Sequence, residues 1–129
     1  MTIKLSDYSC GIIGGNKSYD KSLTIENPTA SEDISFFFTD KALKAHKIRP
    51  ILIGSTPFVQ WTLRYGTDRS AVGTELIAGG TGTTEVTTGI DIETFTSFLI
   101  PANSHVWLET TNKTGTVVSL ALTLFYSEA

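Results

Sequence analysis

Residues 58–65 read FVQWTLRY, and the alternation within this stretch decides the fold class. The apolar residues Val59, Trp61 and Leu63 each stand two positions apart, with polar residues between them. Successive side chains of a β-strand point to opposite faces, whereas a helix repeats its apolar positions every three or four residues. The stretch therefore predicts an antiparallel strand with one face in a core and the other towards solvent.

Strand patterns extend outward from this stretch in both directions. Strands are predicted at residues 21–27, 34–38, 42–53, 92–100, 105–111 and 117–126, with short additions at 74–77 and 85–88. Turn residues separate them at the spacing typical of sandwiches and barrels, and no segment has a sustained helical period. The sequence therefore predicts an all-β fold, a single antiparallel sandwich that is jelly-roll-like and has about eight strands.

Three local signals refine this expectation. Pro50 cannot donate a backbone hydrogen bond, so its strand is expected at a sheet edge or at a bulge. Residues 112–115 (NKTG) resemble a hairpin turn between two strands. Residues 79–84 (GGTGTT) lack the Lys-Ser/Thr ending of a phosphate loop and are expected to form a flexible loop or an extended segment on a partner.

Length and composition are those of one folded domain. The chain has 129 residues, of which 40% are hydrophobic and 18% charged, with a net charge of −3. We assign residues 1–20 to an N-terminal arm and residues 21–129 to the β-sandwich domain. The acidic balance, without a dense basic run, argues against nucleic acid as a partner. No stretch approaches the ~20 apolar residues of a membrane span or the apolar core of a signal peptide, so no membrane partner is expected.

The residues that usually carry chemistry are sparse. The only histidines are His46 and His105, far apart in the sequence, and the only cysteine is Cys10. No catalytic residue, cofactor-binding residue or metal ligand is therefore assigned, no cofactor is expected, and an enzyme is not predicted. Cys10 is interpreted as a small apolar filler, with an intermolecular disulfide or a reactive thiol as the alternative.

The informative residues are aromatic side chains out of phase with the predicted core. Phe37, Trp107 and Phe125 each fall on the face opposite their apolar neighbours, and we take them as candidate interface residues. Three interpretations of these aromatic residues are open. They pack under a loop on the second face of the sheet, they form a subunit interface, or they stack on sugars. We expect Trp107 to be covered by another subunit or by residues 67–91. The core is expected to include Val59, Trp61, Leu63, Leu120, Leu122 and Leu124.

Three blocks taken together resemble short virion-associated proteins of tailed bacteriophages and uncultivated viral genomes. They are IENPTASEDISFFFTDKA (residues 25–42), VQWTLRYGTDRSAVGTEL (59–76) and IPANSHVWLETTNKTGTV (100–117). The resemblance covers most of the chain after about Leu23 and contains no catalytic motif. It implies a head-decoration, fibre or tail-associated protein, and small β domains of that kind commonly form trimers.

Two functions follow as hypotheses. The first is a non-enzymatic structural component of a phage particle, made in the host bacterial cytoplasm, located in the virion and assembled with other virion proteins as a homo-oligomer, with a trimer favoured. The second is a jelly-roll module that binds surface glycans or a receptor. Aromatic residues between subunits would favour the first, and exposed aromatic residues beside polar side chains would favour the second.

Overall fold

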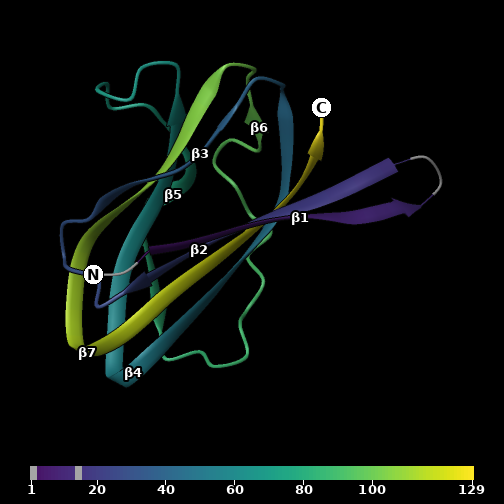
Figure 1. Ribbon diagram of the computed structural model, residues 1–129. Coiled ribbons are helices and arrows are strands. Elements are labelled where there is room, and N and C mark those ends of the chain that lie inside the picture. Colours follow the sequence, from purple (N-terminus) through teal and green to yellow (C-terminus); the bar gives the residue numbers. More distant parts are fainter. Residues whose placement is uncertain (1–2, 14–15) are drawn as a thin grey trace.

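The computed structural model describes residues 3–13 and 16–129, and the described chain is an all-β antiparallel structure (Figure 1). Its strands are β1 (Ile3–Ile13), β2 (Asn16–Glu26), β3 (Asp33–Thr39), β4 (Leu43–Gly66), β5 (Thr74–Thr84), β6 (Leu99–Ile100) and β7 (Ser104–Glu128). The sheet order is β1-β2-β7-β4-β5, with β3 also paired to β7 and β6 to β4. The predicted all-β class and antiparallel sandwich are confirmed, with seven strands where about eight were expected.

Two very long strands, β4 and β7, organise the fold. They pair from Leu43 with Glu128 at one end to Gly66 with His105 at the other. Halfway along, both strands bend and pass from one layer of the sandwich to the other (Figure 1). The first layer holds β1, β2, the second half of β7 and the first half of β4. The second layer holds β3, the first half of β7, the second half of β4 and β5.

The hairpin predicted at residues 112–115 is wrong, because these residues lie within β7 at the bend. Glycine permits the tight approach of the two strands here. A Cβ on Gly115 would lie 2.0 Å from the carbonyl oxygen of Thr56, and one on Gly54 would lie 2.0 Å from that of Thr116. Gly115 also has φ of +71°, a left-handed conformation that side chains disfavour. A turn signal in the sequence thus marks a corner of two paired strands.

The core predictions are confirmed. The six residues expected inside are fully buried: Val59, Trp61, Leu63, Leu120, Leu122 and Leu124. Burying one such leucine stabilises the fold by roughly 1.5–3 kcal/mol. Two polar groups within this region also find partners, since the indole N–H of Trp61 donates to Thr83 Oγ1 at 3.0 Å and the hydroxyl of Thr62 donates to the carbonyl of Ile77 at 2.6 Å.

The position of Pro50 agrees with the expected edge. On one side of β4, Pro50 pairs with Leu122 of β7. On the other side, the amides of Ile48 and Leu52 donate to carbonyls of Ile92 and Val86 at 2.9 and 3.2 Å. Pro50 has the same strand parity as these two residues, so its missing N–H falls on the side where pairing is sporadic. The proline therefore costs the β4–β7 ladder nothing.

Other local expectations are corrected. Residues 79–84 are not a flexible loop, because they form the second half of β5 beside β4. Of the strand expected at residues 92–100, only β6 and an isolated bridge at Ile92 form. Alternation in residues 34–38 predicts that Phe38 lies on the same face as Ile34 and Phe36, but Phe38 is 53% exposed whereas the other two are buried. A register shift between Ser35 and Phe37 changes the phase of β3 before Phe38.

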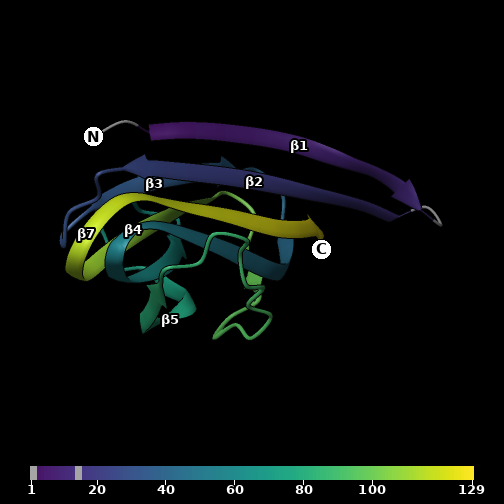
Figure 2. The ribbon, with the colours of Figure 1, turned by 90° about the horizontal axis from the view of Figure 1, so that it is seen from below.

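The hairpin of β1 and β2 extends beyond the rest of the sandwich (Figure 2). β2 pairs with β7 from Tyr19 to Glu26, whereas its pairing with β1 continues outward to Asn16. The residues assigned to an N-terminal arm, 1–20, thus contain β1 and the first part of β2. No helix that could span a membrane occurs among the described residues.

Candidate functional site

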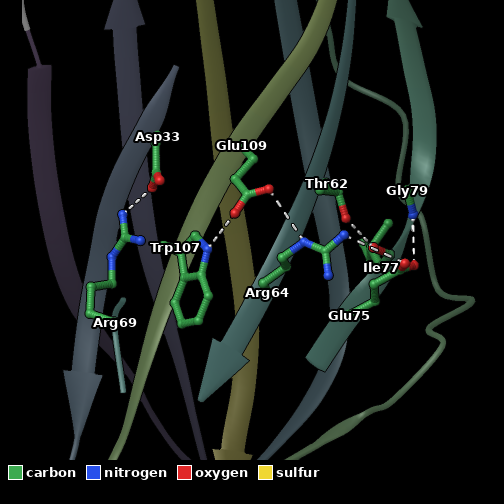
Figure 3. A network of polar contacts seen from close by, with 9 residues as sticks. All are labelled: Asp33, Thr62, Arg64, Arg69, Glu75, Ile77, Gly79, Trp107 and Glu109. Carbon is green, nitrogen blue, oxygen red and sulfur yellow. Dashed lines mark hydrogen bonds and ion pairs between the residues drawn. The ribbon is translucent and has the colours of Figure 1, made fainter. Parts of the chain in front are cut away.

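The outer face of the second layer carries a row of polar side chains that crosses four strands (Figure 3). The register places Ser35 of β3 beside Trp107 of β7, and Trp107 beside Arg64 of β4. Arg64 in turn stands beside Glu75 of β5. Strand pairing thus brings together residues that are far apart in the sequence. We call this surface the polar row; it comprises Asp33, Ser35, Arg64, Arg69, Glu75, Trp107 and Glu109.

Trp107 lies at the centre of the polar row and is fully buried within the single chain. Its indole N–H donates to Glu109 Oε2 at 2.8 Å, and the guanidinium of Arg69 lies 4.7 Å from the ring centroid. Gly73 is packed so tightly on the ring that a Cβ there would lie 2.5 Å from it. Residues 66–73 therefore cover the indole, which is the second of the two expected alternatives. Glu109 satisfies the N–H, and Arg69 adds a cation–π contact.

Ion pairs continue the polar row on both sides of Trp107. Arg69 pairs with Asp33 and donates from Nε to Ser35 Oγ at 3.1 Å. Arg64 is 18% exposed and lies between two acids, with nitrogen–oxygen distances of 3.4 Å to Glu109 and 3.7 Å to Glu75.

The two contacts of Arg64 are electrostatic rather than well-aligned hydrogen bonds. The Nε of Arg64 is buried and has no hydrogen-bond partner, although Glu109 lies at ion-pair distance. Glu75 is fixed from its other side by the backbone N–H of Gly79 at 2.7 Å. Charges of alternating sign therefore hold one another in place along the polar row.

Phe125 lies on the outer face of the first layer, far from the polar row in the register. It is half-buried, with Lys47 Nζ at 4.7 Å and the guanidinium of Arg49 at 5.6 Å from its ring centroid. Both cations also bind Asp91, at 2.6 Å from Arg49 Nε and 3.1 Å from Lys47 Nζ. Hydrogen bonds from Arg49 and then Lys47 lower the pKa of Asp91 to about 2.

Phe37 lies at a third place, at the open side of the sandwich between β3 and the first layer. It is half-buried and stacks on Tyr126 with ring centroids 6.1 Å apart. Tyr126 stacks in turn on Tyr19 of β2 at 5.6 Å, and Lys21 Nζ lies 5.2 Å from the Phe37 ring. The aromatic group therefore bridges the two layers.

The structure does not bring the three candidate interface residues together, and their role in an interface stays a prediction. The residues that sequence reasoning missed are the charged members of the polar row, such as Arg64, Glu75 and Glu109. The alternation within each strand predicts that these residues lie on the outer face. Their contacts with one another depend on the register between strands, which alternation does not give. Among the described residues, no group of three or more histidine, cysteine or acidic side chains is arranged to hold a metal ion.

Comparison with known proteins gives only distant likeness. No protein-family model and no curated protein matches the sequence. A solved structure of infectious bursal disease virus, Gt strain, is similar at a TM-score of 0.36 and 14% identity, covering 98% of this chain and 38% of that chain. T=1 particles derived from infectious bursal virus give 0.37 and 13%, covering 98% and 40%. This chain thus spans about two-fifths of those chains, and TM-scores below 0.5 establish neither a shared topology nor a shared function.

Proposed function

We propose that this chain is a non-enzymatic structural component of a virus particle that acts by protein–protein assembly. The observation that carries this proposal is the β1–β2 hairpin, which extends beyond the sandwich. Part of each strand has no neighbour from the remainder of the described chain except its hairpin partner. An isolated two-stranded hairpin is only marginally stable in water, so such an element is best explained by attachment to another protein.

The sequence resemblance supports the finer form of the proposal. We propose a phage head-decoration, fibre or tail-associated protein, made in the host bacterial cytoplasm and incorporated into the virion. The body of the chain would form a homotrimer, in which the half-buried rings of Phe37 and Phe125 contact neighbouring subunits. Trp107 would contribute indirectly, because it supports the loop of residues 66–73 that covers it.

Incorporation is tested on purified particles from a lysate of the virus-bearing host. Quantitative mass spectrometry of density-banded particles should find the chain at a fixed ratio to the major coat protein, and a wash in high salt should not remove it. Recovery of the chain only in the unassembled fraction would refute the proposal.

The trimer is tested separately by light scattering on the full chain. The expected mass is three times the 14.0 kDa of one chain. Phe125→Ala should shift the mass towards the monomer, whereas Phe98→Ala should not. Phe98 is the matched control, because it too is an aromatic ring beside a lysine, with Lys44 Nζ at 5.9 Å, yet it is no candidate interface residue. A wild-type monomer at high micromolar concentration would exclude the trimer.

A further inference from the structure

The β1–β2 hairpin is joined to the rest of the sandwich through one strand contact. β1 pairs with β2 alone, and β2 pairs with β7 along its second half. Within this contact Leu23 stands opposite Leu122 and Ile25 opposite Leu120, and all four side chains are fully buried. A sandwich without the hairpin would expose this part of the core to water, which is costly. The place on β7 therefore has to be filled by a hairpin of this sequence.

Phe37 lies at the boundary between the hairpin and the rest of the sandwich. Its ring has Lys21 Nζ of β2 at 5.2 Å and stacks on Tyr126 of β7 at 6.1 Å. Tyr126 stacks in turn on Tyr19 of β2 at 5.6 Å. One of the candidate interface residues thus already contacts the hairpin.

The connection between the hairpin and the rest of the chain has a single hinge position, Asn27. Pro28 is buried, and the carbonyl of Thr29 accepts a hydrogen bond from the hydroxyl of Thr110 in β7 at 2.8 Å. The oxygen of the same hydroxyl accepts from the backbone N–H of Glu32 at 2.7 Å. The loop after Asn27 is therefore fixed to β7, and a rotation of the backbone at Asn27 is what would separate the hairpin from it.

The backbone at this hinge is strained. Asn27 has φ of +52°, in the left-handed region, where asparagine is tolerated better than most residues. It directly precedes Pro28, and a residue before proline prefers an extended backbone. An extended Asn27 would relieve this conflict and direct β2 away from its own β7. Short hinge loops under strain favour the exchange of identical elements between copies of a protein.

We propose that the copies of this chain exchange their hairpins, so that the β1–β2 hairpin of each copy lies on β7 of the next. The inference rests on the homotrimer proposed above and names the element that links its subunits. The surface under the hairpin already matches Leu23 and Ile25, so a second copy supplies the fitting occupant. A head-to-tail exchange closes into a ring when the rotation between copies permits, and three copies give the trimer.

The exchanged and unexchanged forms share the same contact between β2 and β7. Only the hinge and the new contacts between neighbouring subunits distinguish them in free energy. The contacts proposed for Phe125 therefore help to decide which form prevails, and Phe37 contacts a neighbouring subunit through Lys21 in the exchanged form.

Disulfide trapping between chains tests the exchange in the full chain. Ser22 of β2 and Thr123 of β7 stand directly opposite, and their hydroxyl oxygens are 2.9 Å apart. Opposite residues of an antiparallel pair have Cα atoms about 4.5–5.5 Å apart, within the range of a disulfide. Chains with Ser22→Cys and chains with Thr123→Cys, both in a Cys10→Ser background, are unfolded together in urea, refolded and mildly oxidised. The control mixture carries Ile51→Cys and Ala121→Cys, which stand opposite in β4 and β7 and stay within one chain in either form.

The expected result is a linked two-chain band on a non-reducing denaturing gel, at least about tenfold stronger than in the control mixture. A chain carrying both Ser22→Cys and Thr123→Cys should give a linked three-chain band. No link between chains in the mixture, or a double variant linked only within single chains or only in pairs, would overturn the proposal. A trimer in light scattering combined with links only within single chains would remove the exchange and leave the proposed trimer intact, whereas a monomer would remove the trimer itself.

The hinge is tested in the same mixture by Asn27→Gly. Glycine adopts a positive φ without steric cost, so the unexchanged form loses its strain and the links between chains should fall at least about threefold. Ala30→Gly, at an exposed position of the same loop, is the matched control and should leave the links unchanged. Equal linking in the Asn27→Gly and Ala30→Gly chains would overturn the assignment of the hinge to Asn27.

Discussion

Replacing Gly115 by alanine should strongly destabilise the fold, because this glycine lies in the corner of β7 against the backbone of β4. The new Cβ would lie 2.0 Å from the carbonyl oxygen and 2.8 Å from the carbonyl carbon of Thr56. Neither atom belongs to a side chain that could rotate away. The left-handed backbone at φ +71° costs alanine about 1–2 kcal/mol, and overpacking adds about 1–3 kcal/mol. The expected loss is therefore about 2–5 kcal/mol in the free energy of unfolding.

Urea denaturation, followed by the fluorescence of the two buried tryptophans, Trp61 and Trp107, measures this loss. Gly79→Ala is the matched control, because a Cβ there meets nothing nearer than Glu75 Oε1 at 3.7 Å, and it should change stability by less than about 0.5 kcal/mol. Gly115→Asn separates the two causes, since asparagine tolerates the left-handed region but still carries the Cβ. A loss below about 1 kcal/mol for Gly115→Ala, or full recovery with asparagine, would show that the close approach of the strands is not what constrains position 115.

Four further changes test the core, the polar row and the ion pairs. Leu122→Ala should lower the free energy of unfolding by about 2–5 kcal/mol in urea denaturation, because it leaves a cavity in the hydrophobic core. Trp107→Ala should lower the free energy of unfolding by about 3–5 kcal/mol. The same change should cause no loss of glycan binding on a glycan array, because the loop of residues 66–73 covers the ring. Gly73→Ala, with a Cβ 2.5 Å from that ring, should release the loop and red-shift the tryptophan emission. Asp91, whose pKa is lowered to about 2, should contribute stability above its ordinary value of 3.8 and lose it as the pH falls through 2, seen by NMR titration of its carboxyl carbon.

A specific result would contradict each of these four predictions. A loss under about 1 kcal/mol for Leu122→Ala would mean that the strand phase of β7 is misassigned. Glycan-dependent tryptophan fluorescence that disappears in Trp107→Ala would favour the carbohydrate-binding alternative. Gly66→Ala is the control for Gly73→Ala, because its Cβ would meet the same ring at an ordinary 3.5 Å and should leave the emission unchanged. For Asp91, titration near pH 4 would contradict the ion pairs.

Strand phase was predictable from the sequence, because it depends only on alternation within each segment. The alternation in residues 58–65 identified Val59, Trp61 and Leu63 as core, and all three are fully buried. Phe38 shows the limit of this reasoning. One irregularity in β3 moves it to the surface, and a shift of one residue reverses every side chain that follows it.

Topology and the polar row were not predictable, because both depend on pairing between distant segments. Residues 112–115 carry turn chemistry that serves equally for a hairpin or for the bend of one continuous strand. These residues form a bend and not a hairpin because they stay paired with β4, which bends beside them at residues 54–57. The contact of Trp107 with Arg69 likewise requires a loop from another part of the chain. Strand phase therefore predicts that the ring lies on the face opposite Val106 and Leu108, but not which residues cover it.

The pairing of β4 with β7 has a consequence for how the chain folds. Taken along the chain, the two strands are the arms of one long hairpin, whose loop is the whole of residues 67–103 with β5 and β6 inside it. Closing that loop to bring Gly66 beside His105 is the entropically costly step, although the cost grows only slowly with loop length. Pairing can then propagate residue by residue through the corner to the far ends. Such non-local pairing typically gives folding in milliseconds to seconds.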